Sequence, residues 1–198
     1  MIWYNQAIHM KDIIENKTIH GEDWSGKKMM SFEISDCTFS DCDFTDVDFF
    51  DSKFFDCVFI KCNFSNAKVT NCGFCNVSFK ECKISGVIFG TINKFLLAWE
   101  FDNCMISLCS FSNIDIKKSK FVDCVIQETD FIDVNLTESD FSNSDLIRSK
   151  FQNANLSRAN FSEATNYLID PITNKIAKAK FSSPEVLALL SAFDITIV

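Results

Sequence analysis

Cysteine and histidine are the side chains of this chain that could supply nucleophilic, redox or metal-binding chemistry. The sequence has ten cysteines and two histidines, and Cys72 and Cys75 have the CxxC spacing of zinc sites and thiol oxidoreductases. Both histidines, His9 and His20, precede the repeats described below, so neither is placed beside a cysteine nucleophile or metal. The five glycines form no phosphate-binding motif. We therefore predict no catalytic residue, no metal site and no cofactor.

The regular spacing of large apolar residues offers another explanation for the cysteines. Large apolar residues recur at every fifth position in two runs, with weaker units expected at Trp24, Met29 and Ile34. The first run is Phe39, Phe44, Phe49, Phe54, Phe59, Phe64, Val69, Phe74, Phe79, Ile84 and Phe89. The second run alternates phenylalanine with isoleucine or leucine: Phe101, Ile106, Phe111, Ile116, Phe121, Ile126, Phe131, Leu136, Phe141, Leu146, Phe151, Leu156 and Phe161.

A small residue stands two positions before each large one, and nine of the ten cysteines occupy such positions. They are Cys37, Cys42, Cys57, Cys62, Cys72, Cys82, Cys104, Cys109 and Cys124. We interpret them as free thiols that fill small core positions, whereas Cys75 falls on an outward position. Aspartate or asparagine often stands two residues after the large residue, where turns favour these side chains.

A period of five matches neither an α-helix nor a long strand. It fits a coil in which each five-residue unit makes one short side and one corner, with the large and small residues pointing inward. The alternation of the second run repeats every ten residues, so four sides per coil would stack like on like, twenty residues apart. The sequence therefore predicts a four-sided coil of about seven turns, spaced about 4.8 Å apart.

This pattern, A-x-Leu-x-x with phenylalanine allowed at leucine, resembles the pentapeptide-repeat family over about residues 34–161. The resemblance implies an all-β solenoid, a right-handed quadrilateral β-helix. Residues 169–190, with Pro171 and Pro184, and residues 195–198 also resemble the C-terminal cap of the quinolone-resistance (Qnr-type) branch. Residues 12–24 resemble the lead-in of that branch more weakly. In that branch the cap forms a head-to-head dimer.

The predicted organisation has five parts. They are an N-terminal lead-in or cap (1–30), a first repeat block (31–90), a register break (91–100), a second repeat block (101–166) and a C-terminal cap with a dimerisation helix (167–198). The break is inferred because Phe89 and Phe101 are twelve residues apart, where ten would keep the register. The two extra residues form either a bulge that restores the register or a partner-contacting protrusion that includes Phe95 and Trp99.

A short helix is expected to close the C-terminal end of the coil. Ser183 is the predicted cap and Pro184 the first helical residue, and the helix should extend to about Ala192. It has too many apolar residues for a helix that buries only one face, so we expect it to contact a second subunit. The predicted homodimer interface consists of Val186, Leu187, Leu189, Leu190 and Phe193.

Acidic residues gather in two bands. The net charge of −8 and pI near 4.7 argue against nucleic acid as a direct ligand and favour a basic partner. Residues 31–60 hold eight acids and one lysine, residues 121–147 hold seven acids and no base, and a basic patch lies between them. The predicted partner-binding residues are Asp36, Asp41, Asp43, Asp46, Asp48, Asp51, Asp56, Asp123, Glu128, Asp130, Asp133, Glu138, Asp140 and Asp145. Alternatively, these are solvated turn residues that keep a repetitive fold in solution.

Localisation is predicted from the absence of two signals. Residues 1–17 lack the apolar core of a secretion signal, and the longest apolar stretches are shorter than the roughly 20 residues of a membrane helix. We therefore expect a cytoplasmic protein that does not enter the membrane. A reducing cytoplasm would keep the cysteines as free thiols.

Two functions remain open at this point. The Qnr-type resemblance implies a non-enzymatic, dimeric acidic rod that mimics DNA. Such a rod binds DNA gyrase or topoisomerase IV, with fluoroquinolone or toxin protection as a consequence. The alternative is a general protein interaction scaffold with an unrelated target. Both hypotheses place the function on the surface of the rod.

Overall fold

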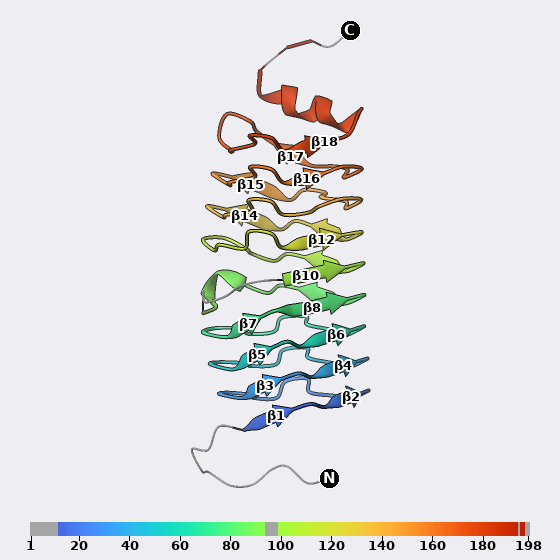
Figure 1. The fold of residues 1–198 in the computed structure, drawn as a ribbon, viewed down its shortest axis with the longest axis vertical. Coiled ribbons are helices and arrows are strands. Elements are labelled where there is room, and N and C mark those ends of the chain that lie inside the picture. The colour runs from blue at the N-terminus through green and yellow to red at the C-terminus, as the bar shows by residue number, and fades with distance from the viewer. Residues whose placement is uncertain (1–11, 94–98, 194, 197–198) are drawn as a thin grey trace.

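A left-handed backbone turn at every fifth residue winds the chain into a four-sided coil. The backbone angle φ is 53° at Asp36 and Asp41, 55° at Asp46, 58° at Asp51 and 51° at Asp56. Short polar side chains tolerate this conformation because they hydrogen-bond to the nearby backbone. The computed structural model describes residues 12–93, 99–193 and 195–196. They form a right-handed rod of about eight turns (Figure 1).

Short parallel strands make many of the sides. They are β1 (Ile13–Glu15), β2 (Thr18–His20), β3 (Glu33–Ser35), β4 (Thr38–Ser40), β5 (Lys53–Phe55), β6 (Val58–Ile60), β7 (Gly73–Cys75), β8 (Val77–Lys80), β9 (Lys83–Ser85), β10 (Trp99–Asp102), β11 (Met105–Ser107), β12 (Lys120–Val122), β13 (Val125–Gln127), β14 (Asp130–Ile132), β15 (Lys150–Gln152), β16 (Asn160–Phe161), β17 (Leu168–Ile169) and β18 (Lys180–Phe181). Two 3₁₀ helices, η1 (Phe89–Thr91) and η2 (Glu185–Phe193), interrupt or end the coil. The strands begin within residues 1–30, the segment expected to be a lead-in, so the solenoid has about eight turns rather than about seven.

The four sides are numbered in chain order, and each is identified by the large residues whose side chains point inward from it. Side 1 carries Ile34, Phe54, Phe74, Ile116, Leu136 and Leu156; side 2 carries Phe39, Phe59, Phe79, Phe101, Phe121, Phe141 and Phe161. Side 3 carries Phe44, Phe64, Ile84, Ile106, Ile126 and Leu146; side 4 carries Phe49, Val69, Phe89, Phe111, Phe131 and Phe151. Strand pairing places Phe39 beside Phe59 and Phe59 beside Phe79, twenty residues apart. The predicted four-sided register is therefore confirmed.

The core holds the large and small residues of each unit, as the sequence predicted. Phe121 and Phe141 stack with ring centroids 4.8 Å apart, and phenylalanines on different sides meet edge to face. The nine cysteines at small positions are buried and free, whereas Cys75 is half-buried. Their packing role is confirmed.

The register changes from twenty to twenty-two residues across the break. Phe59 pairs with Phe79, twenty residues on, whereas Phe79 pairs with Phe101, twenty-two residues on. Asn93 still keeps the earlier register through its hydrogen bond to the Cys72 carbonyl. The two extra residues therefore fall within 94–98, which, with Phe95, lie outside the described residues.

Trp99 is not part of a protrusion. Its side chain is buried, and its indole Nε1 donates to the Phe74 carbonyl over 3.1 Å. The ring packs perpendicular to Phe74, with centroids 6.1 Å apart, and also against Phe89. A tryptophan at a position that is small in other coils therefore fills core space beside the break. The suggestion that Trp99 contacts a partner is wrong.

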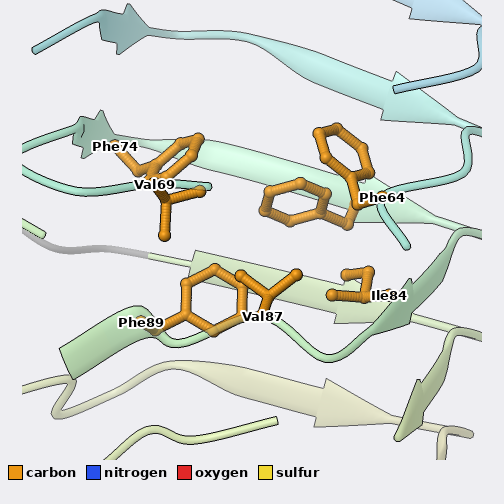
Figure 2. Close-up of a pocket in the computed structure, with 7 residues that line it drawn as sticks. Phe64, Val69, Phe74, Ile84, Val87 and Phe89 are labelled. Atoms are coloured by element: carbon orange, nitrogen blue, oxygen red, sulfur yellow. The ribbon is translucent and has the colours of Figure 1, made fainter. Parts of the chain in front are cut away.

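A small apolar cavity of about 10 Å³ lies below the break (Figure 2). It is lined by Phe64, Val69, Phe74, Phe79, Ile84, Val87 and Phe89. Figure 2 shows Val69 pointing toward Phe89 and Val87 in the next coil. On side 4, Val69 lies between Phe49 in the coil below and Phe89 in the coil above. Its smaller side chain leaves the cavity unfilled. No polar group lines it, so it is a packing defect and not a ligand site.

The C-terminal end closes with η2, which lies across the last coil (Figure 1). The helix begins at Glu185, one residue after the predicted Pro184, and it is a 3₁₀ helix that ends at Phe193. Val186 N–H bonds to the Ser182 carbonyl and Leu187 N–H to the Pro184 carbonyl, so Ser183 does not cap it. Within the described residues, no helix is long and apolar enough to span a membrane.

Candidate functional site

The first acidic band encircles the rod. Its corner aspartates follow one another around the coil, so that Asp36 and Asp56 share the corner between sides 1 and 2. Asp41 lies at the corner between sides 2 and 3, Asp46 between sides 3 and 4, and Asp51 between sides 4 and 1. The remaining two, Asp43 and Asp48, lie on the flat sides 3 and 4. The structure therefore brings all seven predicted aspartates into about one coil, on every side of the rod.

The aspartates of this band bond to neutral donors. The Asp43 carboxylate accepts from the backbone N–H of Thr45 at 2.9 Å, and Asp51 accepts from the side-chain amide of Asn71 at 2.7 Å. Asp41 lies 3.3 Å from the imidazole of the exposed His20. Among residues 12–93, 99–193 and 195–196, none of the seven aspartates forms an ion pair with lysine or arginine. The negative charge of the first band therefore remains largely available to a partner.

Two glutamates of the second acidic band are ion-paired with bases in neighbouring coils. Arg148 Nη2 lies 2.5 Å from Glu128 Oε1, and this hydrogen bond lowers the pKa of Glu128 below its usual range. Glu138 pairs with Arg158 at 3.0 Å and with Lys118 at 3.8 Å.

The other acids of the second band lie at their expected surface positions, and three of them accept hydrogen bonds from neutral asparagine amides, as Asp51 does in the first band. Asp133 accepts from Asn153, Asp140 from Asn160 and Asp145 from Asn166, at distances of 3.2, 2.9 and 2.8 Å. Asp123 and Asp130 also lie on the surface.

The partners of the second band were missed because charges were counted along the sequence. Arg148 and Arg158 stand twenty residues after Glu128 and Glu138, one coil away in space. The twenty-residue register places these residues in neighbouring coils, but only the structure shows that their side chains meet. Within the described residues, the structure thus separates the fourteen predicted partner-binding residues into a first band whose aspartates have no lysine or arginine partner and a second band in which Glu128 and Glu138 have one.

The buried cysteines form a column that continues across the break. Cys42, Cys62 and Cys82 stand twenty residues apart in successive coils, and the shift to twenty-two residues places Cys104 and Cys124 above them. The backbone N–H of Cys104 lies 3.4 Å from the Cys124 Sγ. Elsewhere in the core, burial raises the pKa of the Cys57 and Cys109 thiols to about 11. Such thiols remain protonated near neutral pH, so they are poor nucleophiles and act as packing residues.

Metal binding gains no support from the structure. In the described ranges, no group of three or more histidine, cysteine, aspartate or glutamate side chains is placed to hold a metal ion. Cys72 is buried, whereas Cys75 faces outward from side 1. Cys72, just before β7, therefore points into the core, whereas Cys75, at the end of β7, faces outward, so the CxxC pair shares no face.

The C-terminal helix divides its apolar residues between the core and the surface. Leu189 packs against the hydrophobic core, and Ala188 accompanies it. Leu187 and Phe193 are exposed, while Val186 and Leu190 are half-buried. Leu168 and Ile172, which the sequence analysis did not select, add two exposed apolar side chains at the same end of the rod. The end of the rod therefore presents an apolar surface built from the helix and the last coil.

Comparisons with known families identify the repeats. A family model described as "Pentapeptide repeat region" matches residues 95–166, and one described as "Pentapeptide repeats (8 copies)" matches residues 57–90. No curated protein sequence matches the chain at a significant level.

Solved structures share the fold at low sequence identity. A trypsin-treated variant of QnrB1, a plasmid-mediated fluoroquinolone resistance protein, is 18% identical with a TM-score of 0.74, covering 94% of this chain and 92% of that chain. Another trypsin-treated QnrB1 variant is 16% identical with a TM-score of 0.63, covering 94% of this chain and 100% of that chain. HetL, involved in heterocyst differentiation regulation in the cyanobacterium Nostoc sp. strain PCC 7120, is 10% identical with a TM-score of 0.52, covering 85% of this chain and 84% of that chain. These likenesses establish the fold.

Proposed function

The chain belongs to the pentapeptide-repeat family, and from this premise we propose that it is a non-enzymatic acidic rod that mimics DNA. The expected target is the basic DNA-binding groove of DNA gyrase or topoisomerase IV, and the expected consequence is protection against fluoroquinolones or a toxin. The observation that carries the proposal is that, within the described residues, none of the seven predicted aspartates of the first band is ion-paired with lysine or arginine. The QnrB1 likeness supports it at the level of fold.

The charge density of the first band is comparable with that of duplex DNA. Residues 31–60 carry eight acids and one lysine, a net charge of −7, over one and a half coils. That length is about 7 Å at about 4.8 Å per coil. A duplex carries one negative charge per about 1.7 Å of axis, or about four charges over the same length. Because the phosphates surround a duplex, a band that encircles the rod is a suitable substitute for it.

The proposed dimer would present two such bands to the target. The exposed Leu187, Phe193, Leu168 and Ile172 provide an apolar surface at the C-terminal end. Head-to-head association there would produce a rod of twice the length, with a first band toward each far end. Two bands on one rigid rod would bind a symmetric target more tightly than either band alone.

The test is DNA supercoiling by purified gyrase, with this protein titrated in the presence and absence of ciprofloxacin. Two double variants make the comparison specific: Asp46→Asn with Asp56→Asn, and Glu128→Gln with Glu138→Gln. The two pairs occupy the same two corners of the rod and change the net charge equally, but only the glutamates are ion-paired. We expect the aspartate double variant to raise about tenfold the protein concentration needed for a half-maximal effect on gyrase. The glutamate double variant should change that concentration much less.

The result in the presence of drug distinguishes the outcomes. Rescue of the poisoned enzyme supports protection, and inhibition without rescue keeps DNA mimicry but removes resistance. No effect at micromolar protein favours the alternative, an interaction scaffold with an unrelated target. Equal effects of the two double variants would remove the first band as the binding surface.

The dimer is tested separately by the solution mass of Leu187→Lys. A lysine in an apolar interface should yield monomers, because its charge would lose water without gaining a partner. Ile13→Lys, at the opposite end of the rod and similarly exposed, is the control and should leave the mass unchanged. An unchanged mass for Leu187→Lys would remove η2 from the interface.

A further inference from the structure

Leu108 occupies a corner that the fold otherwise assigns to polar residues. Its φ is 55°, and 62% of its side chain is exposed. Every other non-glycine residue with positive φ in the described part of the chain is Asp, Asn, Glu, Lys, Arg or Ser. A left-handed conformation is unfavourable for leucine, and exposure of the side chain gives nothing in return. An apolar side chain is therefore held in solvent at a cost to the free chain.

Leu108 lies within a larger apolar surface at the middle of the rod. Met105 and Val125 are neighbours on side 3, paired between β11 and β13, and they are 62% and 44% exposed. Ile88 lies on side 4 just beyond the corner and is 58% exposed. We call Ile88, Met105, Leu108 and Val125 the mid-rod patch. The small residues Ser85, Gly86 and Ser107 lie between them. The four apolar side chains therefore project from the surface.

Opposite charges flank the mid-rod patch along the axis of the rod. On side 3, Lys83 pairs with Met105 on one side of the patch, and Val125 bridges to Asp145 on the other. On side 4, Lys68 lies one coil before Ile88, and Ser110 bridges Ile88 to Asp130. The side 3 column therefore begins with lysine and ends with aspartate, whereas on side 4 Asp130 is followed by Lys150 in the next coil.

The order of residues on side 3 is complementary to itself when reversed. A two-fold axis perpendicular to the rod would turn a second copy antiparallel and place its Asp145 opposite Lys83, and its Met105 opposite Val125. A parallel copy would instead oppose lysine to lysine and aspartate to aspartate. We propose that the mid-rod patch is an interface with a second copy of this chain, packed side by side and antiparallel, with Leu108 near the two-fold axis.

The interface is small and therefore weak. Four projecting side chains bury far less than the roughly 800 Å² per partner of a stable protein complex. We expect association only at high protein concentration, or where another contact raises the local concentration. The patch is distant from η2, so the contact is independent of the proposed C-terminal dimer. Together, two self-complementary contacts would join dimers laterally into larger assemblies.

Charge reversal tests the antiparallel arrangement. Sedimentation velocity of the full chain, from micromolar to near-millimolar concentration, should show a mass that rises with concentration. Lys83→Glu and Asp145→Lys should each weaken this association about tenfold, because each replaces two symmetric attractions by repulsions. An equimolar mixture of the two variants should recover it, since the introduced glutamate of one copy would then face the introduced lysine of the other, while the native pair forms across the axis. Lys53→Glu, on the opposite side of the rod, is the control.

A cross-link gives a second, positional readout. A carbodiimide condenses a lysine amine with a carboxylate without adding a spacer, so it should join Lys83 of one copy to Asp145 of the other. Within one chain these residues are three coils apart, about 14 Å, which is too far for a direct amide bond. Leu108→Asn should preserve the backbone turn at this corner, since asparagine accepts positive φ. It should abolish both the concentration-dependent rise in mass and the cross-link. A concentration-independent mass, or single variants that the mixture does not rescue, would overturn the proposal.

Discussion

The two repeat blocks build the same coil around different cores. In the first block, positions 39–64 place phenylalanine on all four sides, and several rings tilt: Phe44 and Phe49 meet at 50°, and Phe49 and Phe64 at 39°. In the second block, phenylalanine occupies only sides 2 and 4. There Phe121 and Phe141 stack within 3°, while Phe121 and Phe131 meet at 90°. Two opposed phenylalanine columns therefore pack regularly, whereas four per coil require adjustment.

The small positions differ between the blocks as well. The first block relies mainly on cysteine, whose Sγ makes long contacts to carbonyls, such as Cys62 to Phe39 at 3.5 Å. The second block uses more serine. Ser144 Oγ donates to the Phe121 carbonyl at 2.7 Å and accepts the Cys124 N–H at 2.9 Å, so it joins two coils. The first block thus depends more on apolar packing, and the second adds buried hydrogen bonds.

The largest effect is expected from a charge in a phenylalanine column. Phe121→Asp should abolish cooperative folding, because the carboxylate would be buried among rings with no partner. Thermal unfolding followed by circular dichroism measures this, with the exposed Gln152→Asp as the control. A cooperative melt of Phe121→Asp near the wild-type temperature would contradict the inward register. A surviving half-amplitude transition would show instead that the blocks unfold separately.

Leu136→Phe converts a second-block coil to the four-phenylalanine pattern. Leu136 is fully buried on side 1, between Ile116 and Leu156. An added ring should overpack the space between the two phenylalanine columns and lower the free energy of unfolding by about 1–3 kcal/mol. Urea denaturation measures the change. If Leu136→Phe left the free energy of unfolding unchanged or raised it, the core of the second block would have room for a phenylalanine on every side. Steric limits would then not explain why phenylalanine alternates with isoleucine or leucine there.

Ser144→Ala tests the buried hydrogen bonds of the second block. The change removes both the donor for the Phe121 carbonyl and the acceptor for the Cys124 N–H, and should cost about 1–2 kcal/mol in urea denaturation. Cys62→Ala is the matched change in the first block. Its weak thiol contacts should make the loss smaller, and equal losses would remove the proposed difference between the blocks.

The smallest effect is expected from filling the cavity below the break. Val69→Ile adds one methylene beside a void of about 10 Å³, and should raise the free energy of unfolding by about 0.5 kcal/mol. Val47→Ile, at a tightly packed small position that does not line the cavity, should be destabilising. Destabilisation by Val69→Ile would show that the first block adjusts its rings rather than leaving usable space.

Most of the fold could be predicted from the sequence because each coil repeats the same local choices. The period of five fixed the inward and corner positions, and the phenylalanine alternation indicated an even number of sides. Nine cysteines fell at buried positions for the same reason. The prediction of Pro184 as the first helical residue was wrong, because the helix begins one residue later, as a 3₁₀ helix. A single short segment lacks the repetition that made the coil predictable.

The candidate surface was less predictable because it depends on neighbours one coil away. The period places Asp46 and Glu128 at equivalent corners, but only the structure shows that Arg148 neutralises Glu128. The break moves the register from twenty to twenty-two residues, which buries Trp99 and pairs Ile88 with Ser110, leaving Leu108 at a corner. The sequence by itself thus determined which residues face inward, since burial follows the repeat. Only the tertiary structure decided which surface charges and apolar groups meet, since those identities do not follow the repeat.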